Sequence, residues 1–93
     1  MNAEYIRILK QARILIETNN EDYICLAIYE VTGERLHPLR IWVFDMLDGN
    51  ETLDSWIIHN YHSYPETSEK TRPVRLAWID AMIKYLEKGG KIK

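Results

Sequence analysis

Hydrophobic and polar residues follow a helical period over most of this chain. The clearest stretch is residues 71–90, in which four apolar residues recur at intervals of three and four: Leu76, Ile79, Ile83 and Leu86. This is the spacing of one face of an α-helix. Thr71 is expected to cap its start, with Pro73 in the first turn, where a missing N–H costs nothing. Gly89 is expected to end the helix in a left-handed conformation.

The other residues of this stretch fall into two sets. One set widens the apolar face: Ala77, Trp78, Met82 and Tyr85. The second set is polar and is expected on the opposite, solvated side: Arg75, Asp80, Lys84 and Glu87. Within it, Asp80 and Lys84 are expected to pair across one helical turn. A helix with so wide an apolar face needs neighbours on two sides, which favours a bundle.

Two earlier stretches also have apolar faces. Residues 3–18 predict a helix with Asn2 as its cap. Residues 21–32 are ambiguous, because the short run YICLAIYEV has no period that separates a buried strand from a helix. Asn20 as a cap and Gly33 as a terminator favour a helix. A strand over residues 23–31, which would make the fold α+β, stays open as the alternative.

The middle of the chain predicts further helices. Pro38 is expected to open one, which stops at residues 48–50 and is central in the fold because its apolar residues surround it. Asn50 or Thr52 is expected to cap another, residues 62–70 to form a loop, and the tail from Gly89 to be frayed. We therefore expect an all-α fold, a compact bundle of four to five mostly antiparallel helices in one domain over residues 1–93.

Composition narrows the class of protein. A hydrophobic fraction of 46% and a charged fraction of 28% are ordinary for a soluble globular domain. The single cysteine, Cys25, excludes an intrachain disulfide and is expected to be a small core residue. Charges interrupt residues 1–18, so no signal peptide is expected, and no apolar run reaches the length of a membrane span. A cytoplasmic protein is the expectation.

Charge is distributed unevenly along the chain. The net charge is −2, yet residues 41–69 contain six acidic residues and no Lys or Arg, and residues 70–93 contain seven basic residues and two acidic ones. The acidic segment also carries aromatic residues, which are common in protein interfaces. We predict a partner-binding surface there: Asp45, Asp48, Glu51, Asp54, Trp56, His59, Tyr61, His62 and Tyr64. The alternative is that Trp42 and Trp56 are core residues and the basic C-terminal segment neutralises the acids.

The sequence gives less support to a metal site, an enzyme active site or a nucleic-acid site. His59 and His62 are three residues apart, but no third metal ligand stands at a fixed offset, so neither a metal nor another cofactor is expected. No nucleophile and base converge in the sequence, which argues against an enzyme. A nucleic-acid site would need the basic residues of the last segment, and the isoelectric point of 5.9 disfavours it. Its candidate residues are Lys70, Arg72, Arg75, Lys84, Lys88, Lys91 and Lys93.

Three groups of residues together resemble the layout of small uncharacterised proteins of bacteriophages and prophages: Ile24, Cys25 and Ala27; Leu53, Trp56 and Ile57; and Arg75, Trp78, Asp80 and Ile83. The pattern carries no catalytic residues. The resemblance implies a phage accessory protein, in which case the chain would inhibit a host or defence protein in the host cytoplasm. Three hypotheses follow: a non-enzymatic module that binds a basic protein surface, a homodimeric structural module, and a nucleic-acid binder acting through the C-terminal helix.

Overall fold

A computed structural model describes residues 2–48 and 65–92, with only the backbone described at Asp48 and residues 65–68. These ranges contain helices and no strand. The helices are α1 (Ala3–Glu17), α2 (Ile24–Thr32), α3 (Pro38–Asp48) and α5 (Pro65–Glu87). The radius of gyration is 12.3 Å, close to the ~12 Å expected for a compact chain of this length. The expectation of an all-α protein is therefore confirmed for the described residues.

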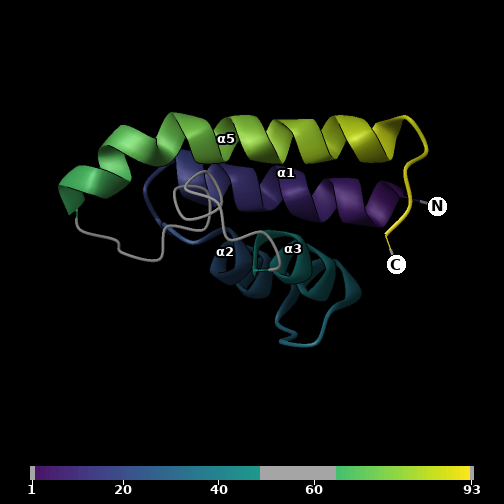
Figure 1. Ribbon diagram of the computed structural model, residues 1–93. Helices are drawn as coiled ribbons and strands as arrows, with labels where there is room; N and C mark the ends of the chain where they lie inside the picture. Colours follow the sequence, from purple (N-terminus) through teal and green to yellow (C-terminus); the bar gives the residue numbers. More distant parts are fainter. Residues whose placement is uncertain (1, 49–64, 93) are drawn as a thin grey trace.

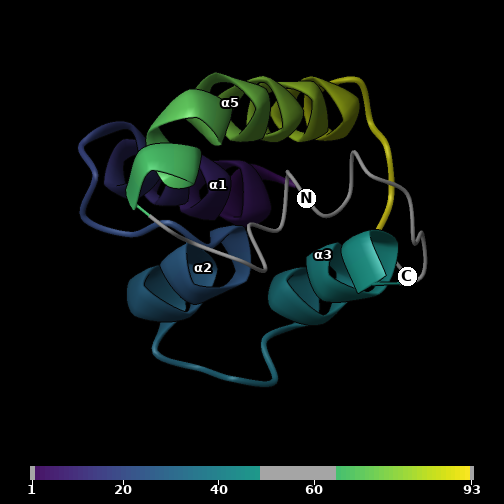
Figure 2. The ribbon, with the colours of Figure 1, turned by 60° about the vertical axis from the view of Figure 1, so that its left-hand side comes forward.

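The helices stack in three layers. α5 runs antiparallel along α1, and the hairpin formed by α2 and α3 lies on the other side of α1 (Figures 1 and 2). Among the described residues, the core between the layers is mostly aliphatic: α1 and α2 each contribute four buried hydrophobic residues, and α3 and α5 each contribute three. The sequence placed the helix that begins at Pro38 in the centre. This was wrong: α3 exposes Ile41 and Phe44, and α1 is the helix that packs against both α2 and α5.

The ambiguous segment is a helix, so the strand alternative for residues 23–31 is overturned. Ile24, Ala27 and Ile28 are all fully buried, which is the three-to-four spacing of a helix face rather than the alternation of a strand. The start differs from the expected cap at Asn20, because Tyr23 keeps an extended backbone and precedes the first helical residue. Gly33 ends the helix in the left-handed conformation (φ 70°), as expected.

α5 begins six residues before the expected cap, at Pro65, so residues 65–70 are helical rather than a loop. Pro73 consequently lies inside the helix, where it cannot donate a hydrogen bond to the carbonyl of Glu69. Figure 1 shows the first turns of α5 inclined to the rest of the helix, as a proline inside a helix would cause. Thr71 does not act as a cap; its hydroxyl accepts a hydrogen bond from Arg75 Nη1 at 2.6 Å.

Arg75 was expected on the solvated side of this helix and is instead fully buried. Burial lowers its pKa, an effect that the nearby carboxylate of Asp22 opposes. Asp80 likewise has a different partner from the expected Lys84. It accepts two hydrogen bonds from Arg13, from Nε at 2.7 Å and from Nη2 at 3.2 Å, which join α1 to α5. Both corrections arise because Arg75 and Asp80 face other parts of the chain, the loop that contains Asp22 and helix α1.

The C-terminal tail was expected to be frayed, and its described part is held in place. Gly89 has φ 90°, its N–H donates to Leu86 O, and Gly90 N–H donates to Tyr85 O, which is the Schellman ending of a helix. The Tyr85 hydroxyl donates to Lys91 O at 2.9 Å and accepts from Lys91 N at 3.1 Å. The tail therefore folds back onto the end of α5.

Asn2 also departs from its expected role. Its side chain makes no cap hydrogen bond to α1. Instead Nδ2 donates to Leu86 O at 3.0 Å and to Gly90 O at 2.6 Å. Asn2 therefore fastens the beginning of α1 to the end of α5 and to the tail that follows it.

Candidate functional site

The outer side of the α2–α3 hairpin carries exposed apolar residues. Among the described residues, seven large hydrophobic side chains are exposed, and four of them belong to this hairpin. These four form what we call the hairpin face: Leu26 (40% exposed), Leu36 (81%), Ile41 (40%) and Phe44 (39%). The hairpin that carries them lies on the side of α1 away from α5 (Figure 1). Among the described residues, the hairpin thus has more exposed large apolar side chains than α1, with Ile14, or α5, with Val74 and Tyr85, and such residues are candidates for binding another molecule.

The helical repeat explains why these residues point outward. On α3, Leu39, Val43 and Leu47 are buried at intervals of four, which places Ile41 on the opposite side and Phe44 at the flank of the buried stripe. On α2, Leu26 lies opposite the buried residues Ile24 and Ile28. Leu36 is in the loop that joins the two helices. Each helix therefore buries one apolar side in the core and also has apolar residues that are exposed to solvent.

Arg40 connects the two helices beneath this face. Its Nε donates to Cys25 O at 3.1 Å and its Nη1 to Arg35 O at 3.0 Å. The guanidinium carbons of Arg35 and Arg40 each lie 5.9 Å from the centre of the Tyr29 ring, a cation–π distance. These contacts tie the connecting loop to both helices and hold the backbone of the hairpin together.

Acidic residues border the hairpin face. Glu30 lies one turn beyond Leu26 on α2, and Asp45 lies one turn beyond Ile41 on α3. A hydrogen bond with the side chain of Glu21 raises the pKa of Glu30, and burial and the negative charge of Glu21 raise it further. Within the described residues, Glu21, Glu30 and Asp45 form no ion pair. We call these three residues the acidic rim.

The expected binding surface is only partly described. Asp45 is exposed at the edge of the hairpin face, and Asp48 ends α3. The seven other expected residues lie outside the described ranges: Glu51, Asp54, Trp56, His59, Tyr61, His62 and Tyr64. The predicted helix after Asn50 lies outside them too. Trp42 is half-buried against the core and stacks on Tyr85, with 5.9 Å between ring centres.

Sequence reasoning did not find Leu26, Leu36, Ile41 or Phe44 as surface residues. Leu26 stands inside the apolar run of residues 23–31, where each residue looks equally suited to a core. Only the correct helical register separates Leu26 from its buried neighbours, and the choice between helix and strand hid that register. Exposed leucines are common on protein surfaces, so a lone one carries little signal.

Other chemical candidates can be placed in the structure. Cys25 is buried, and desolvation raises the pKa of its thiol to about 11, which makes it a poor nucleophile. In the part of the chain that the structure describes, no three His, Cys, Asp or Glu side chains are grouped to bind a metal ion. Likewise, none of the helices there is both long and apolar enough to cross a membrane.

The basic C-terminal segment does not present all of its expected cations to solvent. Arg75 is buried, and Arg72 donates to Glu69 Oε2 at 2.9 Å and to Asn19 Oδ1 at 2.8 Å. Four lysines of the segment are exposed: Lys70, Lys84, Lys88 and Lys91. Phosphate binding through this segment would therefore depend on the lysines.

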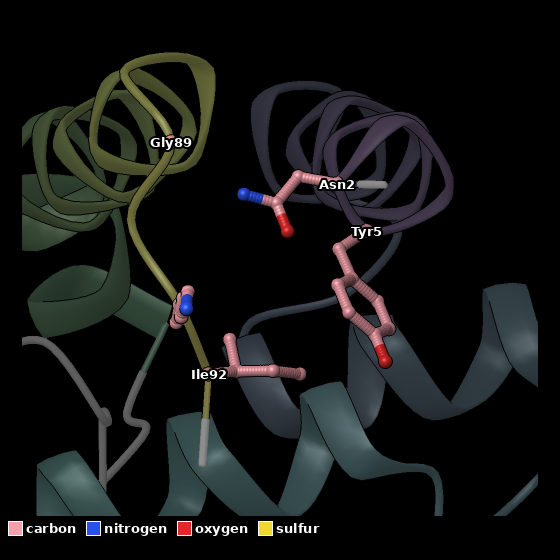
Figure 3. Close-up of a pocket in the computed structure, with 5 residues that line it drawn as sticks. Asn2, Tyr5, Gly89 and Ile92 are labelled. Carbon is pink, nitrogen blue, oxygen red and sulfur yellow. The ribbon is translucent and has the colours of Figure 1, made fainter.

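A pocket of about 430 Å³ lies at the opposite end of α1 from the α1–α2 loop. Its described lining comes from the start of α1 and from the C-terminal tail: Asn2, Tyr5, Gly89, Lys91 and Ile92. Figure 3 shows Tyr5 and Ile92 approaching each other from these two segments, with Asn2 beside them. The His37 ring meets the Tyr5 ring edge to face, with 6.0 Å between centres, and this contact holds Tyr5 against the start of α3.

No family model, curated protein or solved structure matches this chain.

Proposed function

We propose that this protein is a non-enzymatic binding module that attaches to another protein through the hairpin face and its acidic rim. The observation that carries this proposal is that Leu26, Leu36, Ile41 and Phe44, four of the seven exposed large hydrophobic residues among those described, all belong to the α2–α3 hairpin. Burying exposed apolar area is the main driving force of protein association. A preformed face lowers the cost of binding, since few side chains must be ordered.

The charges favour a partner with a basic surface around an apolar centre. Glu21 and Glu30 hold negative charge close together, although each would be more stable beside a cation. Asp45 adds charge at the other edge, at the start of the acidic segment, residues 41–69. Lysine or arginine side chains of a partner would relieve this repulsion, and complementary charge of this kind also speeds association.

The wider setting of the proposal comes from the sequence. We take the molecule to be a bundle of four to five mostly antiparallel helices that acts in the cytoplasm. A phage-encoded inhibitor of a host or defence protein fits these features. The acidic and aromatic residues of 41–69 that lie outside the described ranges would extend the same surface beyond Asp45.

Two exposed isoleucines allow a matched test. Ile41 is on the hairpin face and Ile14 is on α1, with exposed fractions of 40% and 55%. A photocrosslinking amino acid at position 41 should capture a protein in bacterial cells that the same probe at position 14 does not capture. With the captured protein purified, Ile41→Ser should weaken its binding by about tenfold or more, as for a central interface residue. Ile14→Ser should leave the affinity unchanged.

Charge can be tested in the same assay. Asp45→Lys should weaken binding and slow association, whereas Glu87→Lys, an equal change of charge on the exposed side of α5, should do neither. Binding should also weaken as the pH falls through the raised pKa of Glu30, because protonation removes rim charge. Equal effects of the Ile41 and Ile14 substitutions on a validated partner would rule out the hairpin face.

Homodimerisation through the same face is the second candidate, because an apolar face can bind a second copy of itself. In a symmetric dimer, however, the two acidic rims would lie close together and repel. Light scattering over a wide range of protein concentration separates the two cases. A molar mass that doubles in the native protein and stays at the monomer value in Ile41→Ser would show that the face binds a second copy instead of another protein.

A further inference from the structure

The pocket at the start of α1 has the dimensions of a small-molecule site. Its volume of about 430 Å³ falls within the roughly 300–1,000 Å³ typical of such sites. It lies between segments that are far apart in sequence, the first turn of α1 and the C-terminal tail (Figure 3). It is also separate from the hairpin face, with which it shares no residue.

The walls of this pocket are fixed by contacts that do not need a ligand. The Tyr85 hydroxyl holds both backbone groups of Lys91. A side chain at position 90 would collide with the Tyr85 ring, so Gly90 lets the tail pass directly beneath this ring. On the other wall, Asn2 is fastened to Leu86 O and Gly90 O. A ligand would therefore meet a cavity that is already formed, which reduces the entropy lost on binding.

The lining combines apolar walls with few polar groups. Tyr5 and Ile92 supply an aromatic ring and an aliphatic side chain that face each other. Because the Asn2 amide nitrogen is turned toward the tail, its oxygen faces the space between them (Figure 3). Among the described lining residues, Lys91 carries the charge, and it is positive. The nearest acid on α1, Glu4, is bonded to Arg7.

We propose that this pocket binds a small amphiphilic carboxylate, a molecule with an unbranched apolar chain and one terminal carboxylate. The chain would lie between Tyr5 and Ile92, and the carboxylate would lie beside the ammonium group of Lys91. A charge-assisted hydrogen bond from an ammonium group is stronger than a neutral one. A cationic amphiphile would instead place its own positive charge beside that of Lys91 at the mouth of the pocket.

Decanoate serves as the probe, with decan-1-ol as its uncharged match. Titration of decanoate into the purified full-length protein, followed by amide resonances in two-dimensional NMR, should shift Gly89, Lys91, Ile92 and the Asn2 side-chain amide first. Decan-1-ol should bind about tenfold more weakly, because it lacks the charge. Resonances of the hairpin face, such as those of Leu26 and Ile41, should not move.

Two substitutions and a control complete the test. Lys91→Glu should weaken decanoate binding by tenfold or more, whereas Lys84→Glu, the same change on an exposed residue of α5 outside the lining, should have little effect. Ile92→Ser should weaken decanoate and decan-1-ol alike. Lys91→Glu and Ile92→Ser change only side chains, so the backbone hydrogen bonds of the tail stay in place. The proposal fails if decanoate leaves the tail resonances unmoved at millimolar concentration, or if the two lysine variants weaken binding equally.

Discussion

At Cys25, burial controls the chemistry of the side chain. The thiol is 4% exposed, and desolvation raises its pKa from 9.0 to about 11. Thiolates, rather than thiols, attack disulfide reagents. At about pH 8 the folded protein should therefore resist such a reagent, and labelling should follow unfolding as urea is added. Labelling of the folded protein as rapid as that of a free thiol would contradict the burial of this residue.

The same pKa difference predicts how stability depends on pH. Below pH 9 the thiol is protonated in both states. Between pH 9.0 and about 11 the unfolded chain loses this proton while the folded chain keeps it. The free energy of unfolding should therefore fall as the pH rises through this window, by about 1.4 kcal/mol per pH unit. Urea unfolding of Cys25→Ala, measured beside the native sequence, should lack this part of the decline.

Gly90 is a second residue whose identity follows from its surroundings. In Gly90→Ala, the new methyl group would meet the Tyr85 ring, which would have to leave Lys91 and the Trp42 ring against which it stacks. We expect a loss of about 1–2 kcal/mol in the free energy of unfolding, as for other overpacked sites. The NMR signals of the tail should also become sharper with its release. Unchanged stability and unchanged tail signals would contradict the packing described here.

At the scale of the helices, the sequence predicted the elements better than their ends. The start of α3 at Pro38 and the Gly33 and Gly89 terminators were recognisable, because proline and glycine have few conformational roles. The start of α5 was missed, since residues 66–70 are polar and carry no apolar face. Pro73 then looked like a first-turn proline although it lies inside the helix.

Side-chain partners were harder to predict than helices. Arg75 and Asp80 lie on a helix whose apolar stripe is clear, and both looked solvated in the sequence. Their partners come from segments distant in sequence, Asp22 near α2 for Arg75 and Arg13 on α1 for Asp80. Helical periodicity describes one helix at a time, so it cannot show a polar contact between helices. The hairpin face was missed for the same reason, since it combines two helices and a loop.

The Arg13–Asp80 pair tests how α1 and α5 are joined. A double-mutant cycle with Arg13→Ala and Asp80→Ala should give a coupling of about 0.5–1 kcal/mol, because the pair is bidentate yet partly exposed to solvent. The more exposed Glu4–Arg7 pair within α1 is the control and should give less. Added salt should weaken both couplings. A coupling energy no larger than that of the control would show that this pair does not stabilise the contact between α1 and α5.

For the whole molecule, the distribution of charge predicts weak binding to DNA. Among the described residues of the basic segment, four exposed lysines remain once Arg75 and Arg72 are excluded. Each phosphate contact contributes about 0.9 to the slope of the logarithm of affinity against the logarithm of salt concentration. Fluorescence anisotropy with duplex DNA should therefore give a slope no steeper than about −4. A steeper slope would restore the nucleic-acid hypothesis.

The position of α1 between α2 and α5 has a consequence for how the protein is made. α2 follows α1 directly, whereas α5 is synthesised after the other three described helices. While the ribosome is still translating, the side of α1 that packs on α5 stays uncovered, and neither Asp80 nor Leu86 has reached Arg13 and Asn2. Nascent chains that end before Pro65 should therefore be substrates of chaperones, and release should coincide with the docking of the final helix.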